Sequence, residues 1–387
     1  MTLPDSRAFA LYLTGFAAFI GLYLPQPILP LLRQDFGVGV QAASLVISVT
    51  ILGIALAAPL VGIFSDRFGR KRLLVGSAAA LSLVTLGCAF APSFGLLVAL
   101  RFTQGVLLPG LFAVGLTYVS ESLPRTTMNT VAGFYVAATV IGGMLGRVLG
   151  GALADLADWR YGFGLSALLY LGLVAVWARL PALEDKVRRK HLGTALAGTL
   201  GHFRNRTLLG GLLVGFFLFF AFQATFTYLP FRLERPPFSL SSTLIGLTYL
   251  TYTTGVFASG LSGWLRRRLE LRVSFAVGFL LAVVGNLVTL LPSLPVILLG
   301  LLVLCFGNFL VQGLAVGFVA TATENDRAGA NALYLLLYYL GGSLGAFLPG
   351  YLFPVFGYSG VIAAAVAALL AGLLSAVTLT GAREGSS

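Results

Sequence analysis

The chain has 387 residues, of which 58% are hydrophobic and only 10% are charged, and its mean hydropathy is +0.95. Soluble globular domains carry about 25% charged residues, so this composition excludes an ordinary water-soluble domain. The formal net charge of +12 comes from 25 Lys and Arg against 13 Asp and Glu, and its meaning depends on where the basic residues fall.

Long apolar runs follow one another along the whole chain. Taking ~20 apolar residues as the length of a helix that crosses the bilayer core, we expect twelve spans. They cover residues 9–30, 42–63, 74–92, 95–118, 130–153, 162–182, 208–230, 241–262, 273–291, 294–319, 331–353 and 360–380. Backbone in lipid must satisfy its own hydrogen bonds and no alternating strand pattern is present, so the predicted fold class is an all-α polytopic membrane protein.

The basic residues lie mostly on alternate loops between these spans. Clusters occur at Arg67–Arg72, in the stretch 179–206 and at Arg266–Arg268, whereas the intervening loops hold few. The positive-inside rule then predicts that both termini are cytoplasmic and that the protein is integral to the plasma membrane, the inner membrane of a bacterium. The first span serves as its own insertion signal. Because anchoring accounts for the basicity, we expect no nucleic-acid partner.

The least hydrophobic stretch, 183–207, divides the spans six and six. Short sequences recur in the same order on both sides of it. Tyr23-Leu24-Pro25 corresponds to Tyr228-Leu229-Pro230, and Gly142-Gly143 corresponds to Gly341-Gly342. Parallel six-helix repeats are a design of secondary transporters. We therefore expect an N-terminal bundle at 1–182, a cytoplasmic linker at 183–207 and a C-terminal bundle at 208–387, related by pseudo-symmetry.

Amide side chains fall inside the first and fourth spans of each half. Polar groups in lipid are costly and tend to face a bundle interior or a wet cavity, although each amide could instead only join a pair of helices. Their shared placement favours a common solute cavity. The residues predicted to line it are Gln26, Arg101, Gln104, Gln223, Tyr228, Asn308 and Gln312.

The loop between the second and third spans reads Gly62-Ile-Phe-Ser-Asp66-Arg-Phe-Gly69-Arg-Lys-Arg72. It resembles the G-x-x-x-D-R-x-G-R-[KR] signature of the major facilitator superfamily. This resemblance implies alternating access, in which two six-helix bundles rock around a central site. It also implies a conformational lock; the alternative is that these basic residues are only positive-inside anchors. The lock residues would be Gly62, Asp66, Arg67, Gly69, Arg70 and Lys71.

Two further segments resemble motifs of the drug-efflux branch. Arg101-Phe-Thr-Gln104-Gly105 is similar to its R-x-x-Q-G element, whose arginine is tied to proton coupling. The segment from Gly142 to Gly151 resembles the G-x-x-x-G-P-x-x-G-G antiporter motif, with Arg147 in place of the proline. The end of the first span looks most like the YnfM-like branch of bacterial efflux permeases. Glycines expected to allow close helix packing are Gly142, Gly146, Gly150, Gly151, Gly341 and Gly345.

Apart from Arg179 near the end of the span at 162–182, the charges inside the spans are two arginines, Arg101 and Arg147, and no acid lies within an assigned span. Asp35, just beyond the first span, is the best candidate for an acid in the cavity if that helix extends further. The candidate residues for coupling transport to protons are Asp35, Arg101 and Arg147. Asp35 could form an ion pair with Arg101; the alternative is that it is an acid of a solvated loop. Two buried arginines without a buried acid favour an anionic or polar neutral solute over a cation.

An enzyme of the membrane needs a His, a metal cluster or paired acids in its spans, but His191 and His202 lie in the linker and no metal spacing occurs. A channel usually needs a symmetric ring, which this sequence lacks. We expect a secondary transporter, an exporter of a small molecule by proton antiport. The alternatives are an importer or uniporter of an anionic or polar neutral solute, and a membrane scaffold. A monomer in contact with lipid and without a cofactor is expected.

Overall fold

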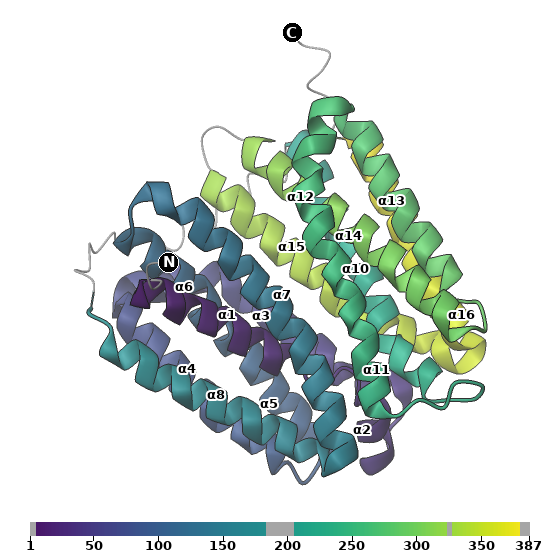
Figure 1. Cartoon of the computed structure of the whole chain (residues 1–387), viewed down its shortest axis with the longest axis horizontal. Helices are drawn as coiled ribbons and strands as arrows, with labels where there is room; N and C mark the ends of the chain where they lie inside the picture. The colour runs from purple at the N-terminus through teal and green to yellow at the C-terminus, as the bar shows by residue number, and fades with distance from the viewer. Residues whose placement is uncertain (1–4, 183–204, 323–326, 380–387) are drawn as a thin grey trace. The chain divides into compact units, whose positions relative to one another are not determined.

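The protein is described here by a computed structural model that covers residues 5–182, 205–322 and 327–379. Over these ranges the chain is built from helices, with no β-strand (Figure 1). The predicted linker at 183–207 lies almost entirely outside the described residues. Two compact units make up the chain. Unit 1 comprises Met1–Gly37, Val49–Lys190 and Leu240–Tyr249, and unit 2 comprises Val38–Ser48, His191–Ser239 and Leu250–Ser387.

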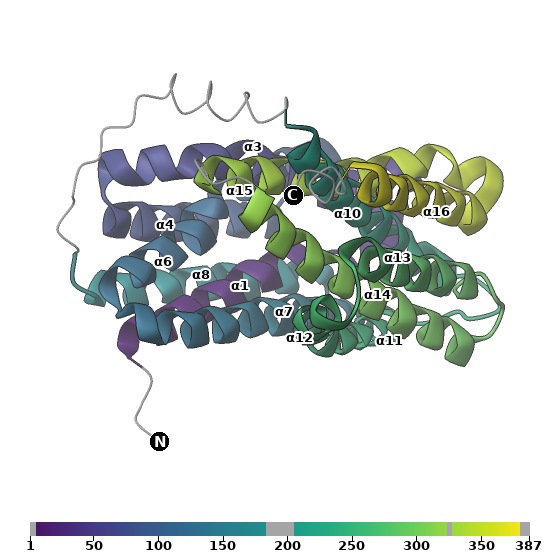
Figure 2. The same cartoon turned by 90° about the horizontal axis from the view of Figure 1, so that it is seen from above.

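Unit 1 contains most of the helices of the first half of the chain and one short helix of the second half. Its helices are α1 (Ser6–Tyr23), α2 (Leu29–Asp35), α3 (Val40–Phe68, of which residues 40–48 belong to unit 2), α4 (Arg70–Ala89), α5 (Phe94–Leu107), α6 (Pro109–Ser122), α7 (Arg125–Leu156), α8 (Trp159–Arg179) and α11 (Ser242–Thr248). Within this unit α1 packs on α7, α4 packs on α8, and α11 packs on α7 (Figure 2).

Unit 2 is organised around α10, which packs on both α15 and α16, while α13 packs on α14. Its helices are α10 (Arg206–Leu233), α12 (Thr253–Arg268), α13 (Leu271–Val288), α14 (Leu294–Ala322), α15 (Arg327–Phe347), the 3-10 turn η3 (Leu348–Tyr351) and α16 (Phe353–Leu379). Asn205 starts α10 because its side-chain oxygen accepts hydrogen bonds from the backbone N–H groups of Thr207 and Leu208.

Eleven helical segments in the described residues are long and apolar enough to cross a membrane. They correspond to the predicted spans with two exceptions. The first is shorter than the predicted 9–30, because α1 ends at Tyr23, two residues before Pro25. The other is the span at 241–262, which is not a continuous α-helix. There α11 passes through the 3-10 turn η2 (Tyr249–Tyr252) into α12. Thr253 and Thr254 donate side-chain hydrogen bonds to carbonyls three residues earlier, a pattern that bends helices. Hydropathy does not register such a break.

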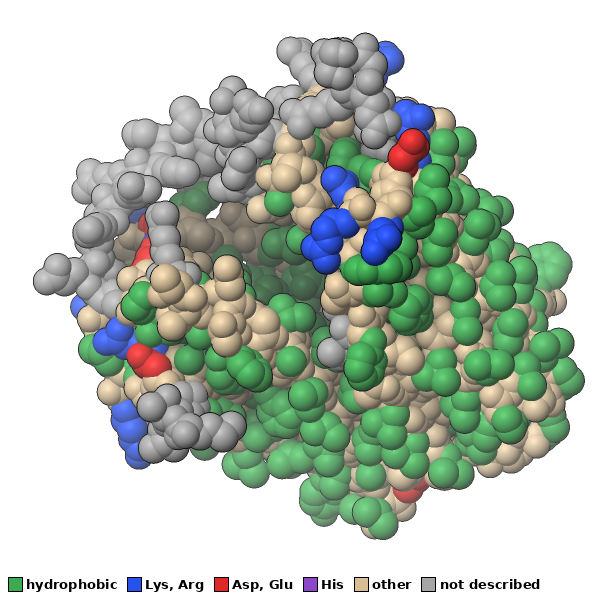
Figure 3. All heavy atoms as spheres, turned by 45° about the horizontal axis from the view of Figure 1, so that its top comes forward, with side chains coloured by type: hydrophobic (Ala, Val, Ile, Leu, Met, Phe, Trp, Pro, Cys, Tyr) green, Lys and Arg blue, Asp and Glu red, His purple; other side chains and the backbone are tan. Residues whose placement is uncertain are grey.

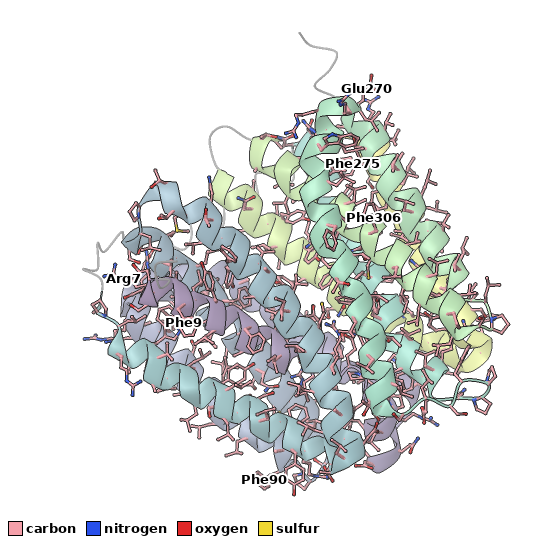
Figure 4. All side chains as sticks on the ribbon, in the orientation of Figure 1. Arg7, Phe9, Phe90, Glu270, Phe275 and Phe306 are labelled. Atoms are coloured by element: carbon pink, nitrogen blue, oxygen red, sulfur yellow. The ribbon has the colours of Figure 1, made fainter. Side chains whose placement is uncertain are left out.

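Exposed side chains are largely apolar, as expected for helices surrounded by lipid. Leu83, Phe90, Phe257 and Val355 are each more than two-thirds exposed. Figure 3 shows many hydrophobic side chains on the visible surface, with the charged ones in a few small separate groups. Figure 4 labels Arg7 and Phe90 at opposite ends of unit 1, and Glu270 at the start of α13 in unit 2.

Candidate functional site

Arg101 of α5 lies fully buried inside unit 1. Its guanidinium donates hydrogen bonds to the carbonyl oxygens of Gly21 and Leu22, at 2.9 Å and 2.7 Å, and to Oε1 of Gln104 at 2.8 Å. Gln104 in turn donates through Nε2 to the hydroxyl of Thr85 on α4, at 2.5 Å. Arg101 and Gln104, two predicted cavity residues, therefore join α5 to α1 and α4.

The sequence of α1 explains why two carbonyls are available to Arg101. The helical partner of the Gly21 carbonyl would be the backbone N–H of residue 25, but that residue is Pro25 and has none. The partner of the Leu22 carbonyl would be the N–H of Gln26, which bonds to the carbonyl of Tyr23 instead. The end of a helix also carries partial negative charge. The guanidinium thus sits where unpaired oxygens and the helix dipole both stabilise a cation.

Arg147 of α7 is buried in a second polar cluster around the same helix end. Its Nε donates to Oε1 of Gln26 at 2.7 Å, and its Nη1 donates to the carbonyl of Gly143 at 2.8 Å. The guanidinium carbon lies 3.9 Å from the ring centroid of Tyr23 and 4.8 Å from that of Tyr249. Cation–π contacts of this kind stabilise a desolvated guanidinium. Predicted residues Gln26 and Arg147 are therefore brought together.

The contact between α7 and α11 within unit 1 was not expected from the sequence. Asp155 accepts hydrogen bonds from the backbone N–H groups of Ser242 and Thr243, at 3.1 Å and 2.7 Å, and so caps the start of α11. A Cβ on Gly151 would meet the carbonyl of Ser242, and a Cβ on Gly246 would lie 2.7 Å from the carbonyl of Arg147. Small residues on both helices allow this close approach.

The other predicted packing glycines repeat one contact in each unit. In unit 1, Gly142 and Gly146 of α7 lie against the backbone of α1 at Phe16 and Ile20, and Gly150 lies against Leu24. In unit 2, Gly341 and Gly345 of α15 lie against the backbone of α10 at Phe216 and Phe220. The repeat found in the sequence therefore recurs as the same helix contact.

The signature loop forms an ion-pair network at one end of unit 1. Arg70 donates to Asp66 at 2.7 Å and binds both carboxylate oxygens of Glu121 at 2.7 Å. Lys71 donates to the carbonyl of Ala178 on α8 at 2.8 Å. Gly69 has a φ of 86°, which permits the turn between α3 and α4. The network ties the ends of α3, α4 and α6 together, and Lys71 adds α8.

Two of the predicted lock residues lie outside this network. The Arg67 guanidinium stands over the ring of Phe68, 5.6 Å from its centroid. A Cβ at Gly62 would have nothing within 4 Å among the described residues. Glu121, the partner of Arg70 in this network, was not among the predicted lock residues. The only feature of the sequence that could have indicated it is its position as an acid at the end of α6, opposite the basic loop.

Asp35 does not pair with Arg101. Its carboxylate accepts a hydrogen bond from the indole Nε1 of Trp159, at 2.6 Å, and lies 4.0 Å from the guanidinium of Arg160. Asp35 and Trp159 lie at the junction between α2 and α8, where Phe36 also packs on the Trp159 ring. The two candidate coupling residues Asp35 and Arg101 therefore belong to different clusters of unit 1.

The predicted cavity residues of unit 2 divide into bonded and unbonded groups. Tyr228 donates to the carbonyl of Ala346 at 2.8 Å, and Gln312 donates to the hydroxyl of Tyr338 at 3.0 Å. Gln223 is fully buried, and among the described residues neither atom of its amide has a hydrogen-bond partner. The side-chain oxygen of Asn308, which is 2% exposed, likewise lacks one within that part of the chain.

Comparisons with known proteins agree along the length of the chain. A model of the Major Facilitator Superfamily matches residues 11–346. The inner membrane transport protein YnfM of Escherichia coli is 31% identical over 381 residues, which cover 97% of this chain and 89% of that protein. The chloramphenicol resistance protein CraA of Acinetobacter baumannii is 26% identical over 336 residues, which cover 85% and 81%.

The fold is also found among solved structures. The crystal structure of a bacterial homolog to the human lysosomal transporter Spinster superposes with a TM-score of 0.78. It covers 98% of this chain and 95% of that chain at 16% sequence identity. At such low identity the likeness concerns the fold alone.

Proposed function

Because the chain belongs to the major facilitator superfamily, a family of membrane transporters and not of enzymes, we propose that it is a secondary transporter that exports a small molecule in exchange for protons. Transport follows alternating access across the bacterial inner membrane. Both termini lie in the cytoplasm, as the distribution of basic residues favours.

One observation carries the proposal: hydrogen-bonding side chains lie buried well inside membrane-crossing helices of both units. Arg101 and Gln104 on α5, with Gln223 on α10 and Asn308 on α14, are all at most 2% exposed. Polar groups at such positions are expensive in a membrane and mark solute or ion pathways.

Export is supported by a relative. CraA is named for chloramphenicol resistance, and a transporter that confers resistance to a toxic solute moves it out of the cell. Two segments, residues 101–104 and residues 142–151, resemble motifs of efflux transporters, which also favours export. Proton exchange is assigned to Asp35, whose exposed carboxylate lies beside Trp159.

The test is transport by the purified full chain in proteoliposomes, with labelled chloramphenicol as the first solute of a panel. We expect saturable solute movement that an opposing pH gradient drives above equilibrium. Counterflow that a pH gradient leaves unchanged would show a uniporter instead. No saturable flux of any solute, in vesicles where a reference transporter works, would leave the scaffold as the better interpretation.

A further inference from the structure

Three polar side chains in unit 2 are buried without satisfying their hydrogen-bonding capacity. Both amide atoms of Gln223, the side-chain oxygen of Asn308 and the hydroxyl of Tyr334 lack partners among the described residues. Buried polar groups in folded proteins are nearly always hydrogen-bonded, because leaving one unpaired costs about 1–3 kcal/mol. Three such groups in one unit therefore need an explanation.

A contact between three helices lies beside them. The ring of Tyr338 on α15 stacks on Phe219 of α10, with centroids 4.2 Å apart and planes inclined by 4°. The hydroxyl of Tyr338 accepts the hydrogen bond from Gln312 of α14. We call Phe219, Tyr338 and Gln312 the Tyr338 triad.

The helix directions place the side chains of Gln223 and Asn308 on the same side of this triad. Gly211 packs on Phe318 and Phe222 packs on Phe309, so α10 and α14 run antiparallel. Gln223 follows Phe219 by one helical turn on α10, and Asn308 precedes Gln312 by one turn on α14. One turn rises about 5.4 Å, so each amide lies about one turn from the triad in the same direction.

Tyr334 flanks the triad from the other direction. It precedes Tyr338 by one turn on α15, and its ring lies 5.8 Å from that of Tyr338. The helix α15 runs parallel to α10, because Tyr334 meets Gly215 and Gly345 meets Phe220. The stacked rings are thus bounded by unpaired polar groups on both sides.

The surroundings are aromatic and uncharged. Phe222, Phe226, Tyr252 and Phe309 form a continuous ring cluster in unit 2, with centroids between 4.7 Å and 6.3 Å apart. The helix α14 carries no charged residue, α15 has none after Arg327, and α10 has none between Arg206 and Arg232. A charged ligand would meet no opposite charge on these helices, and burying an unpaired ion costs several kcal/mol.

We propose that Gln223 and Asn308, with the Tyr338 triad, bind an uncharged aromatic solute that carries a hydrogen-bond donor and an acceptor. The amide of Gln223 offers both a donor and an acceptor, the oxygen of Asn308 requires a donor, and the flat rings offer a stacking surface. This proposal rests on the proposed function in one respect, because it takes the bound solute to be the one that the transporter moves.

The experiment compares three probes that share one ring system: 2-naphthamide, 2-naphthoate and 2-naphthamidinium. Binding to the purified full chain in nanodiscs is measured by titration calorimetry, without any gradient. We expect saturable binding of 2-naphthamide at least tenfold tighter than that of either ion. Equal or tighter binding of the anion or the cation overturns the proposal.

Variants separate a binding role from a structural one. Gln223→Met and Asn308→Leu are expected to weaken 2-naphthamide binding at least tenfold and to leave the thermal midpoint unchanged or raised, because no internal hydrogen bond is lost. The matched control is Asn286→Leu. Asn286 accepts a hydrogen bond from Thr225 and donates to the carbonyl of Ala282, so its loss should lower the midpoint and spare binding. Unchanged binding by Gln223→Met contradicts the proposal.

The binding measurement and the transport measurement fail independently. If the variants behave as expected but no solute moves in proteoliposomes, the proposed function is wrong and the binding site remains. If a solute is transported and Gln223→Met transports it with unchanged affinity, the transporter assignment remains and the site is wrong.

Discussion

Arg101 Nη1 lies 2.9 Å from the carbonyl oxygen of Gly21, the oxygen that Pro25 leaves without a helical partner. A charge that would be costly inside a membrane is thereby stabilised by uncharged groups of the same unit, through hydrogen bonds and a helix end. Arg147 is held in a comparable way by Gln26 and two aromatic faces. These internal contacts remove the reason to expect an anionic solute from the two buried arginines alone.

Replacing Arg101 should destabilise the protein because two carbonyls lose their donors. Each unsatisfied buried carbonyl costs about 1–3 kcal/mol, so Arg101→Met is expected to lower the free energy of unfolding by about 2–6 kcal/mol. Arg101→Lys should recover only part of this stability, since the ammonium group of lysine lacks the planar, forked set of donors of a guanidinium. Thermal unfolding in detergent measures both. Thr103→Val, an exposed change on the same helix, is the control and should have little effect. Equal midpoints for all three variants would contradict this role.

The stacking of Arg147 on Tyr249 predicts an energetic coupling between α7 and the turn after α11. A double-mutant cycle of Arg147→Met and Tyr249→Leu is expected to give an interaction energy of about 0.5–2 kcal/mol. Unfolding of the two single variants and the double variant in detergent gives the value. Pairing Arg147→Met with Leu83→Ala, an exposed position on α4, should give additive effects. Additivity in the Tyr249 cycle would show that the stacking contributes nothing.

Glycines at helix contacts should tolerate a methyl group far less than glycines in open positions. A Cβ on Gly146 would lie 2.7 Å from Cα of Ile20, whereas a Cβ on Gly76 of α4 would meet nothing within 4 Å among the described residues. Gly146→Ala is expected to cost about 1–3 kcal/mol because α1 and α7 must separate. Gly76→Ala should stabilise by up to about 1 kcal/mol through helix propensity. The thermal midpoints should therefore move in opposite directions, and a shared direction would refute the contact.

Asp35→Asn tests proton exchange with little change of structure. Asparagine keeps an oxygen that can accept the hydrogen bond from Trp159, now 2.6 Å long, but it cannot ionise. We expect loss of pH-driven solute accumulation in proteoliposomes with solute counterflow preserved. Asp158→Asn is the matched control, because the Asp158 carboxylate accepts a hydrogen bond from the backbone N–H of Arg160 at the start of α8 and pairs with the guanidinium of the same residue. Undiminished pH-driven accumulation by Asp35→Asn would place the coupling group elsewhere.

The orientation of the chain can be read with two introduced cysteines. Gly95 lies at the start of α5 and Ser120 near the end of α6, and both are exposed. Their separation of 25 residues in the sequence corresponds to about 37 Å along a helix. Both native cysteines, Cys88 and Cys305, are buried. In intact cells Gly95→Cys should react with an impermeant maleimide, and Ser120→Cys should react only after permeabilisation. The reverse pattern would place the termini outside.

Much of the fold was predictable because a lipid environment leaves few choices. Apolar runs of sufficient length must form helices there, and α4, α7, α8, α13 and α14 coincide with predicted spans. The break between α11 and α12 was missed, since threonine hydrogen bonds to the preceding turn do not change hydropathy. The amides were found by their cost in lipid, but their partners were not, because main-chain carbonyls and ring faces leave no mark in the sequence.

The sequence by itself therefore determined the class of protein, the membrane-crossing segments, the family motif and the presence of two buried arginines. Only the tertiary structure decided which polar groups are already occupied. Arg101, Gln104, Gln26 and Arg147 bond within unit 1, whereas Gln223 and Asn308 have polar atoms without a partner in the part of the chain that the structure describes. The physical reason is that a hydrogen bond depends on distance and direction between groups far apart in the chain, and no local pattern of residues encodes either quantity.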